Sequence, residues 1–413
     1  MLRTAPRLTA TTILAAALTA FALLAPASLA LEALERGSVA TLPPVGEHWV
    51  WVPDILLAHS YLYDGDSGEV MATVDGGTTL SPKPPFFSPQ RGEFYSVDID
   101  YSRGRRGKRS DYVSIYDAVT LGVTGEILLP TRTSESASSV AYAAMLDGER
   151  FLATFNQFPN ASVSIVDLAA RRFVEEIVIT GCAGIYPTGE RSFGTLCGNG
   201  TVLSVTLDEQ GRKRDMQPSS PFFDVVSDPV MMAGGRTGER WVFVSFAGIA
   251  HEIDFGQTPP AATAWPLASE GERKADWRPG GRQSVALHAG TERLYVIFHQ
   301  GGSGTHKDPG PEIWAYDLSE RKRVARFGLP NFTAAFLGAN VGVELESFTG
   351  WLLRTLLPDD GADIITVSQD GAPLLFARNS NRGAVAVLDA RTGEHLRFLL
   401  EAGLGGMRLE MAR

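Results

Sequence analysis

The sequence predicts an all-β fold, a seven-bladed β-propeller of four-stranded antiparallel blades with a short helical insertion near residues 332–357. Three observations predict it. A strand–aspartate–turn–strand pattern recurs seven times, a second series of apolar strands accompanies it, and one long apolar stretch interrupts it. Most copies are spaced near the ~40–50 residues that one propeller blade occupies.

Each copy of the repeat is a short alternating strand that ends in aspartate, followed by a turn and a second strand. In the first copy, Tyr-Leu-Tyr-Asp at 61–64 is followed by Gly-Asp-Ser-Gly and the strand 69–74. The aspartate can accept backbone hydrogen bonds in the turn, and glycine tolerates positive φ there. The seven copies end at Asp64, Asp117, Asp167, Asp208, Asp254, Asp317 and Asp389.

A second series of apolar strands precedes several of these copies. We interpret it as the inner strands of the same blades. The opening strand 48–52 has no earlier copy, so we expect it to close the ring by joining the last blade, which removes an open sheet edge. A β-sandwich or a stacked β-solenoid would also contain short strands, but seven spaced copies favour the propeller. The second series comprises 94–97, 151–155, 241–244, 294–298 and 374–377.

The stretch 332–357 interrupts the repeat because it is apolar and rich in helix formers. Its apolar positions at 348, 351, 352 and 356 partly follow a helical period. We therefore predict an inserted helical segment that ends at Pro358 and lies as a lid over the disc of blades. The functional alternative is a docking element or a membrane-surface element.

The start of the chain has the pattern of an export signal. Two arginines lie within the first seven residues, an apolar run follows at 12–24, and small residues come next. This order predicts a cleavable signal peptide over 1–30, an N-terminal extension at 31–45 and the propeller at 46–413. The apolar run is shorter than the ~20 residues of a membrane span, so an uncleaved anchor is the less favoured alternative.

Composition excludes one class of partner and predicts one covalent link. The net charge is −10 and the basic residues are dispersed, whereas a nucleic-acid-binding protein has a clustered basic face. The only two cysteines, Cys182 and Cys197, are separated by Gly184, Pro187 and Gly189, which suit a turn between two strands. Because an exported protein meets oxidising conditions, we expect the two cysteines to form a disulfide.

The residues that could carry chemistry do not form a catalytic pattern. The sequence has no HExxH zinc motif, no GxSxG nucleophile elbow and no Walker loop. His299 and His306 flank a glycine-rich loop at 300–305, where they would be two ligands of a metal without a third, or simply polar groups of a loop. From the residues alone we expect no catalytic, cofactor-binding or metal-binding residue on this chain, which would then be a binding module.

Three sets of segments are not explained by the propeller repeat. They are Asp-Gly-Gly (75–77) with Tyr-Ser-Arg-Gly-Arg-Arg-Gly-Lys-Arg-Ser-Asp-Tyr-Val (101–113); Cys-Ala-Gly-Ile-Tyr-Pro-Thr (182–188) with Phe193 and Cys-Gly-Asn-Gly (197–200); and Asp-Trp-Arg-Pro-Gly-Gly (276–281) with His-Gln-Gly-Gly (299–302) and Thr-His-Lys-Asp-Pro-Gly (305–310). In these segments the chain resembles the heavy (large) subunit of the methylamine and aromatic amine dehydrogenases. The resemblance runs from about residue 46 to the C-terminus.

This resemblance implies a seven-bladed heavy chain in a periplasmic H2L2 complex. A small cysteine-rich light chain would carry tryptophan tryptophylquinone, made by crosslinking two of its own tryptophans. The complex would oxidise a small primary amine to aldehyde and ammonia and pass the electrons to a copper protein similar to amicyanin or azurin. The heavy chain itself would hold no cofactor, and it would support the light chain, wall the substrate channel and help to dock partners.

The resemblance also indicates candidate positions on this chain. The family places an aromatic heavy-chain side chain at the substrate channel, and an ungapped comparison puts Asp54 or Ile55 there, so both are channel candidates. Rigid glycine- and proline-rich loops near 277 and 306 suggest contacts with the light chain, because Trp and Arg are enriched at interface hot spots. The alternative is that the tryptophan and arginine brace two blades. The interface candidates are Trp277, Arg278, His306 and Lys307.

The sequence is compatible with three functions. The favoured one is the heavy subunit of an amine dehydrogenase, although the insertion at 332–357 is longer than expected for the methylamine enzymes. The second is a free-standing secreted β-propeller that binds a ligand or protein without redox chemistry. The third is a propeller enzyme acting alone, such as a lactonase or a dehydrogenase that holds a diffusible quinone.

Overall fold

The protein is described by a computed structural model that covers residues 40–76, 83–135, 139–344, 347–359 and 361–413. Contacts divide the chain at residue 40, and Thr41–Arg413 forms one compact unit. The predicted signal peptide, and the predicted extension up to residue 39, lie outside the described residues. Within the described ranges, no helix combines the length and apolarity needed to cross a membrane.

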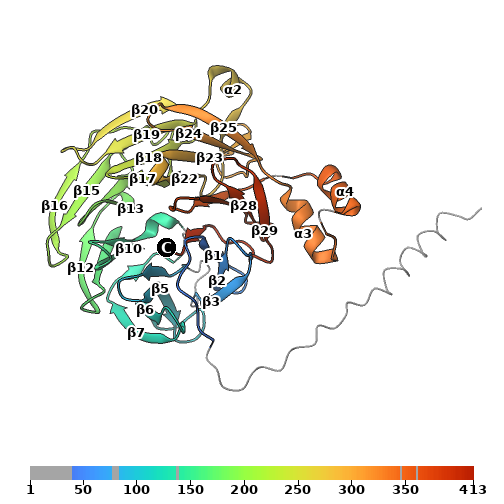
Figure 1. Cartoon of the computed structure of the whole chain (residues 1–413). Helices are drawn as coiled ribbons and strands as arrows, with labels where there is room; N and C mark the ends of the chain where they lie inside the picture. Colours follow the sequence, from blue (N-terminus) through green and yellow to red (C-terminus); the bar gives the residue numbers. More distant parts are fainter. Residues whose placement is uncertain (1–39, 77–82, 136–138, 345–346, 360) are drawn as a thin grey trace, which may run out of the picture. The chain divides into compact units, whose positions relative to one another are not determined.

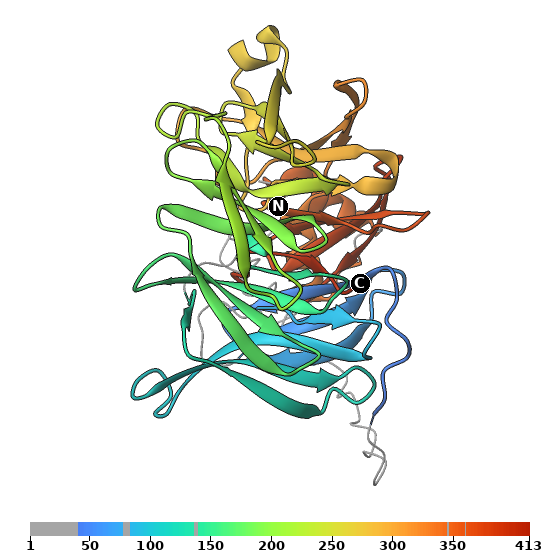
Figure 2. The ribbon, with the colours of Figure 1, turned by 90° about the vertical axis from the view of Figure 1, so that its left-hand side faces the viewer.

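The strands of this unit form seven antiparallel sheets arranged in a ring, which confirms the predicted seven-bladed propeller (Figure 1). Figure 2 shows the ring from the side of blades 3 and 4, so that the outermost strands of these two blades face the viewer. From the centre outward, blade 1 contains β30 (Glu410–Met411), β1 (Trp49–Asp54), β2 (His59–Asp64) and β3 (Val70–Asp75). Blade 2 contains β4 (Phe86–Ser88), β5 (Glu93–Tyr101), β6 (Arg109–Asp117) and β7 (Val123–Leu129).

In blades 3 and 6 the innermost position is shared by two short strands. Blade 3 contains β8 (Arg132–Thr133) and β9 (Ala143–Leu146), then β10 (Phe151–Phe158), β11 (Ser162–Asp167) and β12 (Arg172–Val178). Blade 4 contains β13 (Cys182–Gly189), β14 (Ser192–Cys197), β15 (Val202–Leu207) and β16 (Lys213–Pro218). Blade 5 contains β17 (Val230–Thr237), β18 (Arg240–Ser245), β19 (Ile249–Asp254) and β20 (Ala261–Pro266).

Blades 6 and 7 complete the ring. Blade 6 contains β21 (Trp277–Pro279) and β22 (Val285–His288), then β23 (Arg293–Gln300), β24 (Glu312–Asp317) and β25 (Lys322–Gly328). Blade 7 contains β26 (Ile364–Val367), β27 (Leu374–Asn379), β28 (Ala384–Asp389) and β29 (His395–Leu399). The described helices are η1 (Val140–Tyr142), α2 (Glu270–Lys274), η2 (Ala289–Thr291), α3 (Phe332–Val341) and α4 (Phe348–Leu356).

The middle strands of each blade are buried on both faces because blades pack against blades on either side. All six residues of β27 are buried, whereas β7, at the outer edge of blade 2, buries only alternate residues in its second half. The strands that we interpreted as inner strands are the second strands of their blades. The innermost strands of blades 4 and 5, β13 and β17, have eight residues each. In the other blades the innermost strands have two to four residues, and these short strands have no detectable pattern in the sequence.

The repeat aspartates are turn residues, as predicted. Asp117 Oδ1 accepts hydrogen bonds from the backbone N–H groups of Val119 (3.1 Å) and Thr120 (2.7 Å). These bonds, led by the one from Thr120, lower the pKa of Asp117. Asp389 makes the same pair of bonds to Arg391 and Thr392. The side chain thus fixes the turn between the third and fourth strands of each of these blades.

The ring closes differently from our expectation. The prediction that the opening strand joins the last blade is wrong, because β1 pairs with β2 inside blade 1. The C-terminal strand β30 completes that blade instead, with Val50 opposite Met411 and Trp51 opposite Glu410. Since β30 has only two residues, it is too short to show an alternating pattern in the sequence.

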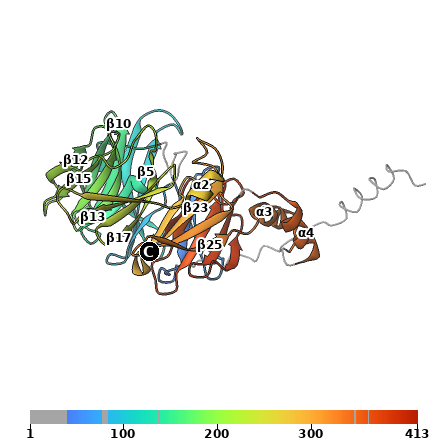
Figure 3. The same cartoon turned by 90° about the horizontal axis from the view of Figure 1, so that it is seen from above.

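The predicted helical insertion is present, between blades 6 and 7, as the two helices α3 and α4. They lie at the outer side of blade 7 and not over the opening of the ring (Figures 1 and 3). The prediction that the insertion forms a lid over the disc of blades is therefore wrong. Phe332 is fully buried and packs edge-on against Phe398 of β29, with ring centroids 5.6 Å apart. Asn331 caps α3 by accepting from the Ala334 N–H (2.7 Å) and donates to the Leu357 carbonyl at the end of α4 (2.9 Å).

A histidine links blades 1 and 7 on the face of the ring that carries the aspartate turns. His48 Nδ1 lies 2.8 Å from Asp66 Oδ2 in blade 1, and Nε2 lies 3.2 Å from Asp370 Oδ1 in blade 7. Burial alone would lower the pKa of His48, but the two carboxylates outweigh it and raise the pKa above 6.5. The charged imidazolium is therefore the form that holds the two blades together.

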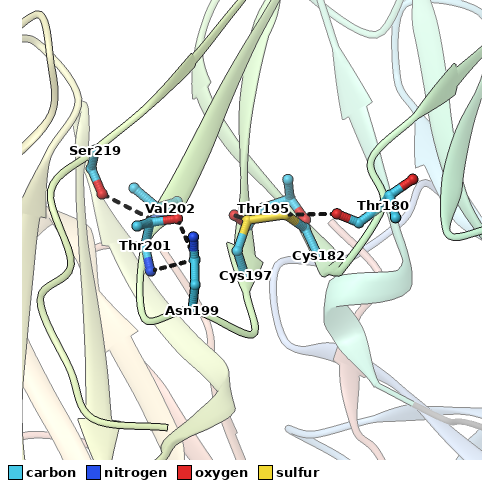
Figure 4. The surroundings of a disulfide bond; sticks show 8 residues. All are labelled: Thr180, Cys182, Thr195, Cys197, Asn199, Thr201, Val202 and Ser219. Atoms are coloured by element: carbon cyan, nitrogen blue, oxygen red, sulfur yellow. Dashed lines mark hydrogen bonds between the residues drawn. A yellow bond between two sulfur atoms is a disulfide. The ribbon is translucent and has the colours of Figure 1, made fainter.

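The disulfide between Cys182 and Cys197 is present, as predicted, and joins paired positions of β13 and β14 (Figure 4). Beyond Cys197 the chain turns through Asn199, whose Oδ1 accepts hydrogen bonds from the Thr201 N–H (3.2 Å) and hydroxyl (2.8 Å). The disulfide and this turn together fix the first two strands of blade 4.

We predict that replacing both Cys182 and Cys197 with serine lowers the free energy of unfolding by ~3 kcal/mol. The disulfide closes a loop with a sequence separation of 15, for which the chain-entropy model gives about that loss. Chemical denaturation of wild type and the double variant measures it. Equal stability, or two free thiols found by mass spectrometry in protein exported from the cell, would contradict the assignment.

We predict that the stabilising effect of His48 is present at acid pH and lost at alkaline pH. Because the folded-state pKa is raised above 6.5, the contribution is complete below that value and disappears as the pH rises through the raised pKa. His48→Gln should cost about 1 kcal/mol near pH 5.5 and almost nothing near pH 8.5. Thermal melts across this range measure the difference, and parallel curves for the two proteins would refute the idea.

Candidate interaction face

The two faces of the ring carry different kinds of loop. Because the strands of each blade are antiparallel, the loops between second and third strands emerge on the same face as the connections from one blade to the next. We call this the long-loop face. The aspartate turns and the loops between first and second strands emerge on the opposite face. The long-loop face carries the loops 55–58, 102–108, 198–201, 246–248, 301–311 and 380–383 and the described parts of the connections 219–229, 267–276, 329–363 and 400–409.

Parts of each set of segments that the propeller repeat did not explain lie on this long-loop face. The arginine-rich stretch at 102–108 links β5 and β6, and Gly-Asn-Gly at 198–200 follows β14. In blade 6, the segment 276–281 contains β21, which pairs with the end of β23, and the segment 299–310 continues from that end into the loop 301–311. Their contact is tight: a Cβ added to Gly280 would lie 2.2 Å from His299 Nδ1. Motifs from three blades thus share one surface.

A first cleft of about 530 Å³ lies on this face between blades 5 and 6. Three of the four interface candidates, Trp277, Arg278 and His306, line it, and the fourth, Lys307, is exposed next to it. The His306 ring stacks on Phe246 with centroids 3.7 Å apart. Burial and then the Lys307 charge lower the pKa of His306 below 6.5, so this aromatic pair is uncharged at neutral pH.

Trp277 and Arg278 have different surroundings. Trp277 is half-buried, packs 5.4 Å from the Trp314 ring and lies under the Arg326 guanidinium at 4.8 Å. These partners belong to blade 6, and Trp277 also packs against a buried apolar cluster to which blades 5 and 6 both contribute. Arg278 has a side chain 25% exposed, and its Nη2 lies 3.9 Å from Asp276 Oδ1. Its Nε is buried and has no hydrogen-bond partner among the described residues, so another molecule can reach only the exposed part of the guanidinium.

The two loop histidines of this region do not form a metal site with their neighbours. His299 Nε2 lies 2.8 Å from the Thr305 hydroxyl, and burial lowers the pKa of His299. No group of three or more His, Cys, Asp or Glu side chains in the described part of the chain is placed to hold a metal ion.

A second cleft of about 240 Å³ contains the channel candidate Asp54. It lies between the β1–β2 turn, the second half of α3, the β27–β28 turn and the connection 400–404. Ile55 adjoins the cleft without lining it, and its N–H donates to the Leu404 carbonyl (3.1 Å). The next two side chains, Leu56 and Leu57, are 71% and 60% exposed at the tip of the turn.

A buried arginine holds the segments around this second cleft. Arg378, in β27, donates from Nη2 to the carbonyls of Pro53 (2.9 Å), Ala402 (3.1 Å) and Gly403 (3.1 Å). Burial lowers the pKa of Arg378 to about 10, so it is still charged at neutral pH. The sequence did contain a signal, an arginine within the apolar run of β27. Sequence reasoning missed its role, as it missed Tyr61 and Glu401 in the cleft.

Comparison with known proteins matches the sequence to one family. The methylamine dehydrogenase heavy chain (MADH) family matches residues 53–335. The chain belongs to this family. Its methylamine dehydrogenase heavy chain relatives include those of Methylorubrum extorquens AM1, 26% identical with 92% of this chain and 87% of the relative covered, and Methylobacillus flagellatus, 26% identical with 97% and 96% covered. The heavy chain of Paracoccus versutus is 26% identical over 84% of this chain and 75% of the relative.

Solved structures confirm the fold. The dihydro-heme d1 dehydrogenase NirN in complex with DHE superposes with a TM-score of 0.50 at 16% identity, covering 91% of this chain and 77% of that chain. A protein of unknown function from Desulfotomaculum acetoxidans gives a TM-score of 0.52 at 12% identity, covering 87% and 98%. At these identities the likeness concerns the propeller and not its activity.

Proposed function

We propose that this chain is the heavy subunit of a periplasmic quinoprotein amine dehydrogenase, which deaminates primary amines to aldehyde and ammonia and passes electrons to an amicyanin- or azurin-like copper protein. The match of residues 53–335 to the methylamine dehydrogenase heavy chain family is the observation that carries the proposal. The gathering of the unexplained segments on the long-loop face supports it, because a subunit that binds a partner needs a dedicated surface.

The role of this chain would be to hold and orient a small cysteine-rich light chain in an H2L2 complex. That light chain would carry tryptophan tryptophylquinone, which accepts the electrons of amine oxidation. On the long-loop face, the exposed Leu56 and Leu57 offer apolar contact area, and the part-exposed guanidinium of Arg278 lines the first cleft. Apolar side chains and arginine at the centre of a patch are typical of protein interfaces.

Asp54 would lie where the substrate path meets this interface. It ends β1 two residues before the first of the two exposed leucines, and it lines the second cleft. A light chain seated on Leu56 and Leu57 would therefore place its own substrate-binding groups close to Asp54. At this position the chain would contribute a carboxylate and not an aromatic ring to the channel.

We predict that the purified chain alone shows no amine-dependent dye reduction and no quinone absorbance, and that both are found in its complex with a light chain. The light chain to test is a small, cysteine-rich, secreted protein with two tryptophans, encoded in a neighbouring reading frame. Co-expression, co-purification and a dye-reduction assay measure both parts. Turnover by the chain free of any small subunit would refute the proposal, and so would failure of every such light chain to bind.

We predict that Arg278→Ala weakens light-chain binding at least tenfold and leaves the thermal stability nearly unchanged, because the ion pair of Arg278 with the exposed Asp276 is long, at 3.9 Å, and such a pair contributes little to stability. Trp277→Ala is the matched contrast. It should lower the free energy of unfolding by about 2 kcal/mol, since Trp277 packs on Trp314 and Arg326. A thermal melt beside a co-purification assay separates the two effects, and a large melting shift with normal binding for Arg278→Ala would end the interface role.

A further inference from the structure

The second cleft combines a carboxylate with an unused oxygen, a second carboxylate, a phenol ring and apolar walls. Asp54 is only 5% exposed, and its Oδ1 is occupied by the N–H groups of Leu56 (2.7 Å) and Leu57 (3.1 Å). Its other oxygen, Oδ2, accepts no hydrogen bond from any residue in the described ranges. The backbone bonds fix the carboxylate in place at the cleft, and Oδ2 has unfilled acceptor capacity.

A second carboxylate faces the same space from a distant part of the chain. Glu401 lines the cleft from the connection between β29 and β30. Tyr61 lines the cleft together with both acids, and burial, then Asp54, then Glu401 raise the pKa of its hydroxyl. Both negative charges thus act on the region around one aromatic ring.

The rest of the lining is apolar. Leu57, Phe336, Leu400 and Leu404 form walls from the β1–β2 turn, α3 and the 400–404 connection. The cation at this cleft, Arg382, is tied to α3 by its Nε, which donates to the Thr333 hydroxyl (3.2 Å). The other nearby cation, Arg378, is buried and directed at backbone carbonyls.

We propose that this cleft binds a primary ammonium ion that carries an apolar body, with the ammonium group between Asp54, Glu401 and the face of Tyr61. Carboxylates and an aromatic face are the groups that bind ammonium in proteins, and Phe336 and the leucines suit an aryl or alkyl chain. The volume of about 240 Å³ lies just below the roughly 300–1,000 Å³ of sites for drug-sized ligands, which fits an arylalkylamine. This inference rests on the proposed function in one respect: it takes the ammonium ion to be the substrate of the amine dehydrogenase complex.

One wall of the cleft lies outside the family match. The match ends at residue 335, inside α3, whereas Phe336, Ala339 and Asn340 of the same helix line the cleft. The helical insertion therefore supplies the apolar wall that a small amine such as methylamine would not contact. The cleft accordingly favours an amine with a larger apolar body.

The test is calorimetric titration of the isolated full chain with 2-phenylethylammonium, methylammonium and the neutral 2-phenylethanol. We expect phenylethylammonium to bind at least tenfold more tightly than either of the other two probes. Asp54→Asn and Glu401→Gln should each weaken its binding about tenfold, and Phe336→Ala should reduce the preference over methylammonium. Asn at position 54 keeps an oxygen for the two backbone N–H groups, so the turn is retained, and Glu401→Gln changes an exposed side chain that the fold does not need.

Glu394→Gln is the matched control, because this exposed carboxylate lies in the aspartate turn of blade 7 on the opposite face. It should leave binding unchanged. Equal binding of phenylethanol, or unaltered binding in both carboxylate variants, would overturn the inference. Because the titration needs neither light chain nor quinone, amine binding without an active complex would count against the proposed function alone. If the complex is active but neither Asp54→Asn nor Glu401→Gln changes its affinity for amines, the result would count against the cleft alone.

Discussion

The whole ring depends on one very short pairing, that of β30 with β1. The ring of a propeller is held closed where its two chain ends meet in one blade, and here two residues near the C-terminus complete a blade begun near residue 49. Other contacts reinforce the junction between the first and last blades. Arg378 of blade 7 holds the backbone at the end of β1, and His48 connects the same blades on the opposite face. Apolar packing between blades supplies the bulk of the stability, while these polar contacts fix which blades meet.

Burial on both faces explains which parts of the fold could be predicted. Strands such as β28 are apolar over most of their length, and an aspartate turn follows, so the pattern is visible in the sequence. The innermost strands β8 and β30 have two residues each and leave no pattern, which is why the closure was assigned to the wrong strand. The insertion was recognised by its apolar residues, but its position depends on Phe332 docking against Phe398, a contact between distant segments that no local pattern contains.

The candidate site shows the same limit. Asp54 was found only through the resemblance to a family, and the disulfide only through the export signal and a count of two cysteines. Tyr61 lies close to Asp54 because both belong to the β1–β2 hairpin. Glu401 joins them because blades 1 and 7 are neighbours in a closed ring, although it is far from both in the chain. A sequence in which every blade contributes a few loop residues to one face cannot show which of those residues meet until the order and closure of the blades are known.

The position of α3 has a consequence for how such a protein can diversify. The helix is attached at a junction between two blades, and its buried residues lie mainly in its first turns. The second half of the helix can therefore change in sequence or length without disturbing the strands that determine the architecture. Selectivity for the guest molecule is in this sense modular, since a single appended element can be exchanged while the platform and its partner surface are conserved.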